Sequence, residues 1–168
     1  YPDEYLKNHT YTKLGGRADF FITPTRYEDV QNLVIFCKKS GIPLTLIGNG
    51  SNLIVRDGGI RGVVLSLKKM NAIHVEGNRV IAQSGAAIID TSRKALEASL
   101  TGLEFACGIP GTVGGALFMN AGAYGGEIKD VLESCLVVDR NGELKTRLAE
   151  ELDLSYRHSN IEEKGDIV

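Results

Sequence analysis

The 168-residue chain is long enough to bury a substantial core, and its length suits either one ordinary domain or two small lobes. With 43% hydrophobic and 24% charged residues, its composition gives no argument for disorder. A formal net charge of -2 provides no basic surplus for nucleic-acid binding, and the apolar runs are too short to cross a membrane. Three widely spaced cysteines, Cys37, Cys107 and Cys135, predict neither a disulfide framework nor a zinc site and favour the cytoplasm.

The first part of the chain predicts a strand, a helix and a second strand in succession. Residues 18–23 and 44–47 are short β-prone runs. Between them, residues 28–40 carry apolar side chains at the i, i+3, i+4, i+7 spacing of a helix that packs on one side. Thr25 and Glu28 stand three residues apart, as in a capping box. The pattern predicts a βαβ unit.

Two further apolar runs, residues 52–55 and 62–67, predict short strands. They would complete a first lobe over residues 1–70. From residue 72 the character of the sequence changes, so a second lobe is expected over residues 71–168.

The second lobe begins with a predicted hairpin over residues 72–82, which contains a glycine-bearing turn. A helix over 87–100 follows, with Gly102 as its stop. Its expected buried face comprises Ile89, Leu96 and Leu100. Asn141-Gly142 predicts the turn of a later hairpin, and the last residues, 166–168, resemble the start of a new strand. The lobe is therefore expected to be α+β.

The first glycine cluster is a small polar loop directly after the predicted strand 44–47. It comprises Gly48, Asn49, Gly50, Ser51 and Asn52. Backbone N–H groups can converge in such a loop and form a nest for an anion such as a pyrophosphate. A plain tight turn between two strands is the alternative. The loop lacks the Rossmann fingerprint, because Leu53 occupies the position of the third glycine.

The second cluster precedes a predicted short helix that ends at Met119. It comprises Gly108, Ile109, Pro110, Gly111, Thr112, Val113, Gly114 and Gly115. The helix N-terminus favours a phosphate, and the glycines let a flat ligand or a second backbone approach closely. A Walker P-loop is excluded because no lysine follows the glycines. The alternative is a glycine-lined packing site between a helix and a sheet.

A third cluster, residues 120–127, surrounds Tyr124 with small residues and is typical of a loop that lines a site. Two glycine-rich nests in adjacent lobes suggest a long ligand with a central diphosphate, such as a dinucleotide. Arg157 can clamp a carboxylate or phosphate, although an arginine in this setting is often a surface ion-pair residue. The three histidines are isolated from one another, so no metal site is predicted.

These segments together closely resemble the N-terminal half of UDP-N-acetylenolpyruvoylglucosamine reductases. The resemblance rests on residues 48–52, 102–115 and 120–125, with residues 15–19 and 155–157 matching in order and spacing. It implies the two-lobed, α+β FAD-binding fold of the vanillyl-alcohol-oxidase type. In the family, a third domain covers the substrate, and this chain is expected to lack it.

By this resemblance, FAD binds non-covalently, NADPH reduces the flavin, and hydride then passes to the enolpyruvyl ether of UDP-N-acetylglucosamine to give UDP-N-acetylmuramate for peptidoglycan. The cofactor-binding candidates are Gly48, Asn49, Gly50, Ser51, Asn52, Gly108, Ile109, Pro110, Gly111, Thr112, Gly114, Gly115, Asn120 and Gly122. Arg157 matches the family's active-site arginine, which polarises the substrate carboxylate. Tyr156 and Tyr124 would contact the substrate.

The resemblance also implies that the family's proton-donor serine and assisting glutamate lie beyond residue 168. No nucleic-acid, membrane or obligatory protein partner is expected. Two other functions stay open: another FAD-dependent oxidoreductase of the same fold, or a non-catalytic nucleotide-binding module. The first would often carry a flavin-linking histidine in its first lobe, and none lies between His9 and His74. A purely structural domain would leave the glycine clusters unexplained.

Overall fold

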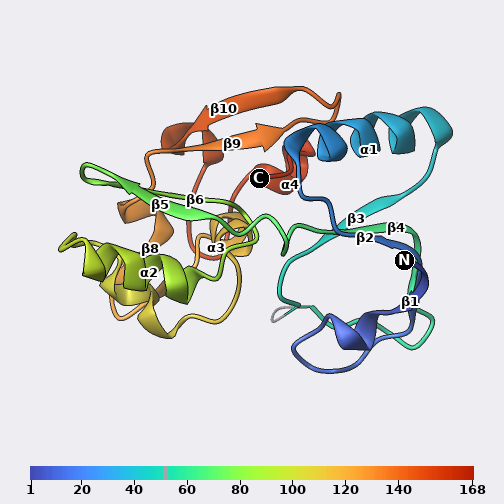
Figure 1. Cartoon of the computed structure of the whole chain (residues 1–168), viewed down its shortest axis with the longest axis horizontal. Coiled ribbons are helices and arrows are strands. Elements are labelled where there is room, and N and C mark those ends of the chain that lie inside the picture. The colour runs from blue at the N-terminus through green and yellow to red at the C-terminus, as the bar shows by residue number, and fades with distance from the viewer. Residues whose placement is uncertain (51–52) are drawn as a thin grey trace.

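The computed structural model describes residues 1–50 and 53–168, and Figure 1 shows the path of the chain. The helices are α1 (Tyr27–Ser40), α2 (Ile88–Glu97), α3 (Val113–Met119) and α4 (Ile161–Lys164). Short 3₁₀ helices lie at Leu6–Asn8, Glu104–Gly108, Ile128–Asp130 and Ala149–Leu152. The strands are β1 (Pro2–Tyr5), β2 (Arg17–Ile22), β3 (Leu44–Ile47), β4 (Ile60–Ser66), β5 (Ile73–Glu76), β6 (Arg79–Ala82), β7 (Gly122–Ala123), β8 (Gly126–Glu127), β9 (Ser134–Val138) and β10 (Leu144–Leu148).

The N-terminal part of the chain is built on a four-stranded sheet with the strand order β1-β2-β4-β3. Strands β2 and β3 both run parallel to β4, whereas β1 runs antiparallel to β2. The predicted βαβ unit is therefore confirmed as β2, α1 and β3, with β4 inserted between its two strands. This topology places the C-terminal end of β3 at the sheet edge where ligands often bind.

The prediction of a strand at residues 52–55 is wrong for residues 53–55, the part of this run that the structure describes. Leu53, Ile54 and Val55 are in no strand, and Asn52 lies outside the described residues. Val55 is buried in the core and Leu53 packs against it, while Ile54 is 78% exposed, so the segment packs by side chains without joining the sheet. Strand β1 forms the edge of the sheet next to β2, and its polar sequence shows no alternating pattern from which a strand could be predicted.

Helix α1 begins at Tyr27 and ends at Gly41, which adopts the left-handed conformation with φ 65°. The predicted capping box is wrong, because Arg26 is the N-cap residue and no side-chain hydrogen bond caps the helix. Arg26 instead pairs with Asp29, with 3.1 Å between Nη2 and Oδ1. The buried residues of the helix are Val30, Val34 and Cys37, as the apolar spacing predicts.

Helix α2 ends earlier than predicted and buries a different face. The helix ends at Glu97, and Ser99 adopts a left-handed conformation with φ 58°, so the chain leaves the helix before the predicted stop at Gly102. Leu96 is 76% exposed, and the buried residues are Ile88, Thr91, Ser92 and Ala95. Small side chains face the core because α2 packs closely on the 3₁₀ segment around Phe105, and Ser92 Oγ donates to Leu103 O at 2.9 Å.

The hairpins predicted at residues 72–82 and 135–145 are confirmed as β5-β6 and β9-β10. At the last residues, Ile167 forms an antiparallel bridge with Val138, with N···O distances of 2.8 and 2.9 Å. The expected strand start at 166–168 is thus a single bridge on the edge of β9.

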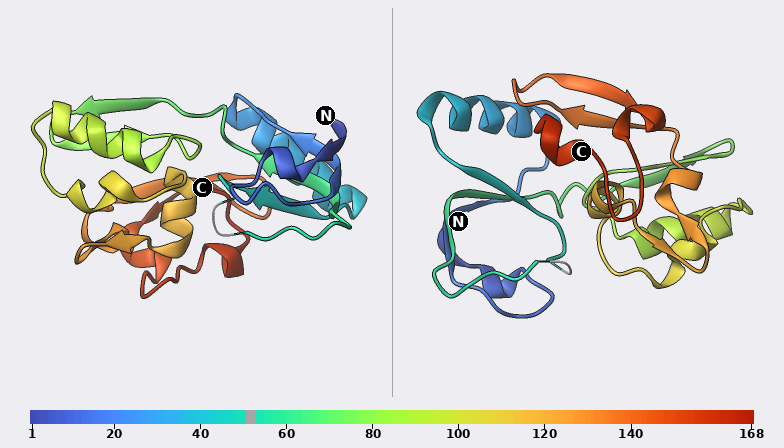
Figure 2. Two further views of the ribbon diagram at one scale, coloured as in Figure 1. Left: turned by 90° about the horizontal axis from the view of Figure 1, so that it is seen from below. Right: turned by 180° about the vertical axis from the view of Figure 1, so that it is seen from behind.

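Helix α1 also packs against the β9-β10 hairpin, as Figures 1 and 2 show. Gln31 Nε2 donates to Gly142 O at 2.9 Å, and Lys38 Nζ donates to Asn141 Oδ1 at 2.6 Å. One buried apolar cluster joins the helix, the sheet and the hairpin: Val30, Val34, Leu65, Leu67, Met70 and Val138. The two parts of the chain share this core, and the predicted lobe boundary between residues 70 and 71 stays a prediction.

Candidate functional site

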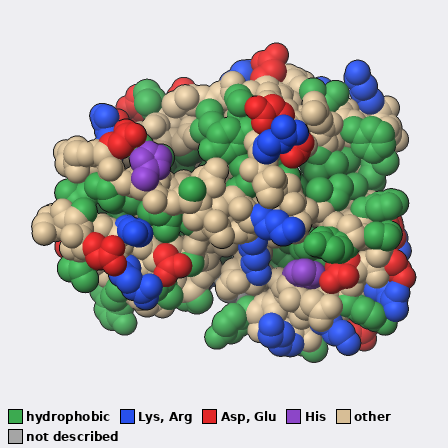
Figure 3. Space-filling model, in the orientation of Figure 1, with side chains coloured by type: hydrophobic (Ala, Val, Ile, Leu, Met, Phe, Trp, Pro, Cys, Tyr) green, Lys and Arg blue, Asp and Glu red, His purple; other side chains and the backbone are tan. Residues whose placement is uncertain are grey.

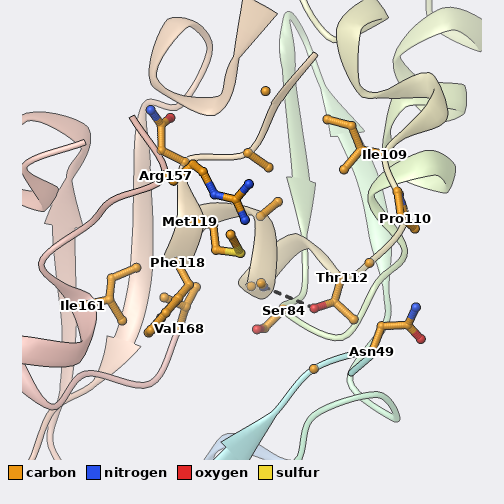
Figure 4. A pocket seen from close by; sticks show the side chains of 18 of the residues that line it. Asn49, Ser84, Ile109, Pro110, Thr112, Phe118, Met119, Arg157, Ile161 and Val168 are labelled. Carbon is orange, nitrogen blue, oxygen red and sulfur yellow. Dashed lines mark hydrogen bonds between the residues drawn. The ribbon is translucent and has the colours of Figure 1, made fainter. Parts of the chain in front are cut away.

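A cavity of about 1200 Å³ lies where the glycine-rich segments meet. Figure 4 shows its wall, which comprises the loop after β3, the exit of β6, helix α3 and the loop that carries Arg157. The predicted residues that line it are Gly48, Asn49, Gly50, Ile109, Pro110, Gly111, Thr112, Gly114, Gly115, Asn120, Gly122, Tyr156 and Arg157. Gly108 and Tyr124 do not line it, and Ser51 and Asn52 lie outside the described residues.

The first loop of the cavity follows β3 and is held against residues 10 and 11. Gly50 has φ 67°, and a Cβ atom at this position would lie 2.7 Å from Thr10 Cα. Its carbonyl accepts a hydrogen bond from Tyr11 N at 3.4 Å. A side chain at residue 50 would force these backbones apart, so the close approach requires glycine.

Thr112 joins the first and second glycine clusters. Its hydroxyl accepts a hydrogen bond from Gly115 N at 3.2 Å and caps α3, as the dashed line in Figure 4 marks. A Cβ atom at Gly48 would lie 3.1 Å from the same hydroxyl. Segments more than sixty residues apart in sequence therefore meet at Thr112.

The N-terminus of α3 offers fewer unpaired N–H groups than the sequence predicts. Val113 N donates to Ala86 O at 2.8 Å, and Gly114 N donates to Ser84 O at 2.9 Å. Together with the bond from Gly115 N to Thr112, these contacts satisfy the first turn within the protein. The phosphate expected at the helix end stays a prediction, and the N–H groups of residues 113–115 already have partners within the protein.

The third cluster is anchored by Asn120, which is 3% exposed and ends α3 in the left-handed conformation. Its Nδ2 donates to Ser155 O at 3.0 Å, and its Oδ1 accepts from Lys129 N at 2.8 Å. Gly122 follows in the β7-β8 hairpin. Tyr124 is at the tip of that hairpin with φ 52° and is 89% exposed, so its predicted substrate contact stays a prediction.

Arg157 lies at the tip of a tight turn and has φ 50°. In Figure 4 its guanidinium points from this turn toward the centre of the cavity. Among the described residues it makes no hydrogen bond and no ion pair. A guanidinium presented without a protein partner is suited to a planar anion such as a carboxylate. Tyr156, beside it, is 87% exposed and also lines the cavity.

Several lining residues could not be identified from the sequence reasoning, among them Lys68, Ser84 and Gly85. Burial, and secondarily the charge of Lys13, hold the pKa of Lys68 below its ordinary value. The sequence feature that could have indicated a close approach at Gly85 is the run of small residues at positions 84–87. Acidic side chains also line the cavity, at Glu127, Asp130 and Glu162.

The surface and the remaining side chains add two findings. Acidic and basic side chains are interspersed on the face that Figure 3 shows. Within residues 1–50 and 53–168, no group of three or more His, Cys, Asp or Glu residues is arranged to hold a metal ion. Over the same residues, no helix has both the length and the apolar character needed to span a bilayer.

Comparison with known proteins shows that this chain is similar to flavin-binding proteins. A family model described as FAD binding domain matches residues 18–147. The UDP-N-acetylenolpyruvoylglucosamine reductase of Oceanobacillus iheyensis is 63% identical over 166 residues, which cover 99% of this chain and 54% of that protein. The chain thus spans about half the length of the curated relatives that it matches.

Solved structures agree with the family match. The crystal structure of UDP-N-acetylenolpyruvylglucosamine reductase from Thermus caldophilus superposes with a TM-score of 0.82 at 32% identity, covering 98% of this chain and 58% of that chain. 6-Hydroxy-D-nicotine oxidase from Arthrobacter nicotinovorans shares the fold, with a TM-score of 0.65 at 22% identity over 90% of this chain and 35% of that chain. The predicted α+β FAD-binding fold of the vanillyl-alcohol-oxidase type is confirmed.

Proposed function

Because the chain belongs to the family of FAD-binding domains, we propose that it is the flavin-binding part of a UDP-N-acetylenolpyruvoylglucosamine reductase. The observation that carries the proposal is the single cavity lined by both glycine clusters and by Arg157. The identity of 63% over nearly the whole chain supports the choice of this reductase over other flavoproteins of the fold.

The cavity suits a dinucleotide such as FAD. Its volume of about 1200 Å³ exceeds that of typical ligand pockets, which measure roughly 300–1,000 Å³, and so leaves room for a long ligand. Gly48, Gly111 and Gly115 line the cavity without a side chain, so a ligand can approach the backbone closely at these positions. Thr112, which touches both glycine clusters, would lie near the middle of such a ligand.

Under this proposal, the loop at residues 48–52 and the segment at residues 109–115 hold the FAD diphosphate. Asn120 and Gly122 border the flavin. The proposed lobes, residues 1–70 and 71–168, would each contribute one of the two diphosphate loops. The predicted contact of Gly108 stays a prediction, because this glycine does not line the cavity.

Bound FAD supplies the hydride-transfer chemistry, and we propose NADPH as the external hydride donor. The proposed substrate is the enolpyruvyl ether of UDP-N-acetylglucosamine, which becomes UDP-N-acetylmuramate for peptidoglycan. Arg157 binds the substrate carboxylate through its planar fork of donors and stabilises the negative charge that develops next to it. Tyr156 lines the same pocket.

The test of the proposal is an anaerobic absorbance experiment on the purified full-length protein loaded with FAD. We expect the flavin bands to bleach when NADPH is added and to return when the enolpyruvyl UDP-sugar follows. A non-catalytic nucleotide-binding module would show no flavin bands. Another oxidoreductase of this fold would fail to regain the bands with this substrate, and either result contradicts the proposal.

We also propose that the protein works in the cytoplasm and needs no protein partner for flavin binding. Its three cysteines, Cys37, Cys107 and Cys135, are free thiols, as expected in a reducing compartment.

A further inference from the structure

The turn that presents Arg157 is held in an unfavourable backbone conformation. Ser155 N donates to His158 O and His158 N donates to Ser155 O, both at 3.1 Å, so Tyr156 and Arg157 form its two-residue tip. Arg157 has φ 50°, a left-handed conformation in which side chains with a Cβ atom are disfavoured. Neither tip residue is buried, so the geometry of the turn depends on contacts at its base.

One contact at the base comes from Asn120 at the end of α3. Ser155 O, which closes the turn, also accepts a hydrogen bond from Asn120 Nδ2 at 3.0 Å. The other end of the same amide accepts from Lys129 N at 2.8 Å, which fixes its orientation, since a backbone N–H can only donate. Asn120 is 3% exposed, so water cannot replace these bonds without a rearrangement.

A second contact comes from Ser159 on the other side of the turn. Its hydroxyl donates to Phe118 O at 2.6 Å and accepts from Ile161 N at 3.4 Å. Ser159 is 7% exposed. The C-terminal end of α3 is therefore bonded to the chain both before and after the Arg157 turn.

We propose that Asn120 and Ser159 are positioning residues that clamp the Arg157 turn to the end of α3. The N-terminal end of the same helix adjoins Thr112 and the glycine segment, so α3 sets the distance between the cofactor loops and the guanidinium. The inference rests on the proposed function, because that function assigns Arg157 to the substrate carboxylate. It goes beyond that function by assigning the placement of the arginine to two side chains that need not touch the substrate.

The test compares Asn120→Gly and Ser159→Ala in the FAD-loaded full-length protein with Asn160→Ala as a matched control. Glycine keeps the left-handed conformation at residue 120 and removes both amide bonds. Asn160 lies in the same loop and donates to Glu151 O at 2.8 Å, away from the turn. Anaerobic stopped-flow absorbance then measures flavin bleaching by NADPH and the return of the bands with substrate.

We expect the return of the bands to slow about tenfold or more in both variants, because small misplacement of a substrate-binding group is costly. In Ser159→Ala, bleaching by NADPH and FAD content should stay within about twofold of the parent protein, because Ser159 does not line the cavity. Both rates should stay within the same range in the control. In an Arg157→Ala background, Ser159→Ala should add no further loss. Hydrogen exchange of the His158 amide should become faster in Asn120→Gly whether or not the protein is active.

Two outcomes would overturn the clamp: an unchanged His158 exchange rate in both variants, or a further tenfold loss from Ser159→Ala when Arg157 is already alanine. Failure of the proposed function has a different signature. In that case Arg157→Ala leaves the return of the bands unchanged, while His158 exchange still reports whether Asn120 holds the turn.

Discussion

Single residues decide how closely the walls of the cavity approach one another. At Gly85, a Cβ atom would lie 1.8 Å from Leu67 O and 2.8 Å from Lys68 Cα. These are backbone atoms, so no side-chain rotation can relieve the overlap. The backbone at residue 85 therefore fixes where Leu67 and Lys68 meet the cavity.

We expect Gly85→Ala to destabilise the protein by about 1–3 kcal/mol, the usual cost of overpacking, and to weaken FAD binding. Urea unfolding and a fluorescence titration with FAD measure the two effects. Gly58→Ala is the matched control, because a Cβ atom there meets nothing within 4 Å. If the two variants unfold at the same urea concentration, the packing argument for Gly85 fails.

The carboxylate of Asp139 is a second residue with a measurable role. Its Oδ2 lies 2.9 Å from Lys145 Nζ, and its Oδ1 accepts from the backbone N–H groups of Asn141 and Glu143. Lys145 first, and then the N–H of Glu143, lower the pKa of Asp139 to about 2 from an ordinary value of 3.8.

Because the folded-state pKa of Asp139 lies below the unfolded value, its stabilisation is present above pH 4 and is lost as the pH falls toward 2. Asp139→Asn should therefore lower the free energy of unfolding by about 1–2 kcal/mol at pH 7. The difference between parent and variant should shrink between pH 4 and pH 2.5. Chemical denaturation across this range is the measurement, and a difference independent of pH would contradict the assignment.

At the scale of elements, the docking of α1 on the β9-β10 hairpin connects the two parts of the chain. Gly142 has φ 82°, and a Cβ atom there would lie 2.6 Å from Ile35 Cγ1. Gln31 donates to the carbonyl of the same glycine. The hairpin turn thus meets the surface of α1 with no room for a side chain.

Gly142→Ala should destabilise the protein by about 1–3 kcal/mol more than Gly77→Ala. Gly77 is also a hairpin-turn glycine in the left-handed conformation, with φ 60°, but a Cβ atom there meets nothing within 4 Å. The difference between the two variants in urea unfolding isolates the contact with α1. Adding Ile35→Ala to Gly142→Ala should recover part of the loss, and no recovery would place the cost elsewhere.

At the scale of the whole molecule, the cavity is lined by residues from both parts of the chain, from Leu46 to Val168. A ligand that fills it must bind the folded state and not the unfolded chain. Binding energy therefore adds to the free energy of unfolding by mass action.

We expect FAD at about 100 times its Kd to stabilise the folded protein by about 2.7 kcal/mol. Thermal unfolding followed over a series of FAD concentrations should show a midpoint that rises with the logarithm of concentration. FMN, which lacks the adenylate half, is the matched control and should shift the midpoint less at equal concentration. Equal midpoints with and without FAD would exclude this cavity as the flavin site.

The sequence alone determined most of the local elements. Apolar spacing identified α1 and its buried face, and turn residues identified the hairpins at residues 72–82 and 135–145. The glycine clusters predicted a dinucleotide site, and the resemblance of their order and spacing to a reductase family indicated FAD. The local elements can be predicted because they depend on neighbours within a few residues.

Only the tertiary structure decided which of those features meet and what they meet. Four features depend on contacts with distant segments. They are the buried face of α2, the absence of a strand at Leu53–Val55, the pairing of the first N–H groups of α3 and the position of Tyr124 outside the cavity. The same holds for the contacts of Gly85 with Leu67 and of Asn120 with Ser155. Such contacts depend on how segments far apart in the sequence pack against one another. The spacing of neighbouring residues gives no information about that packing.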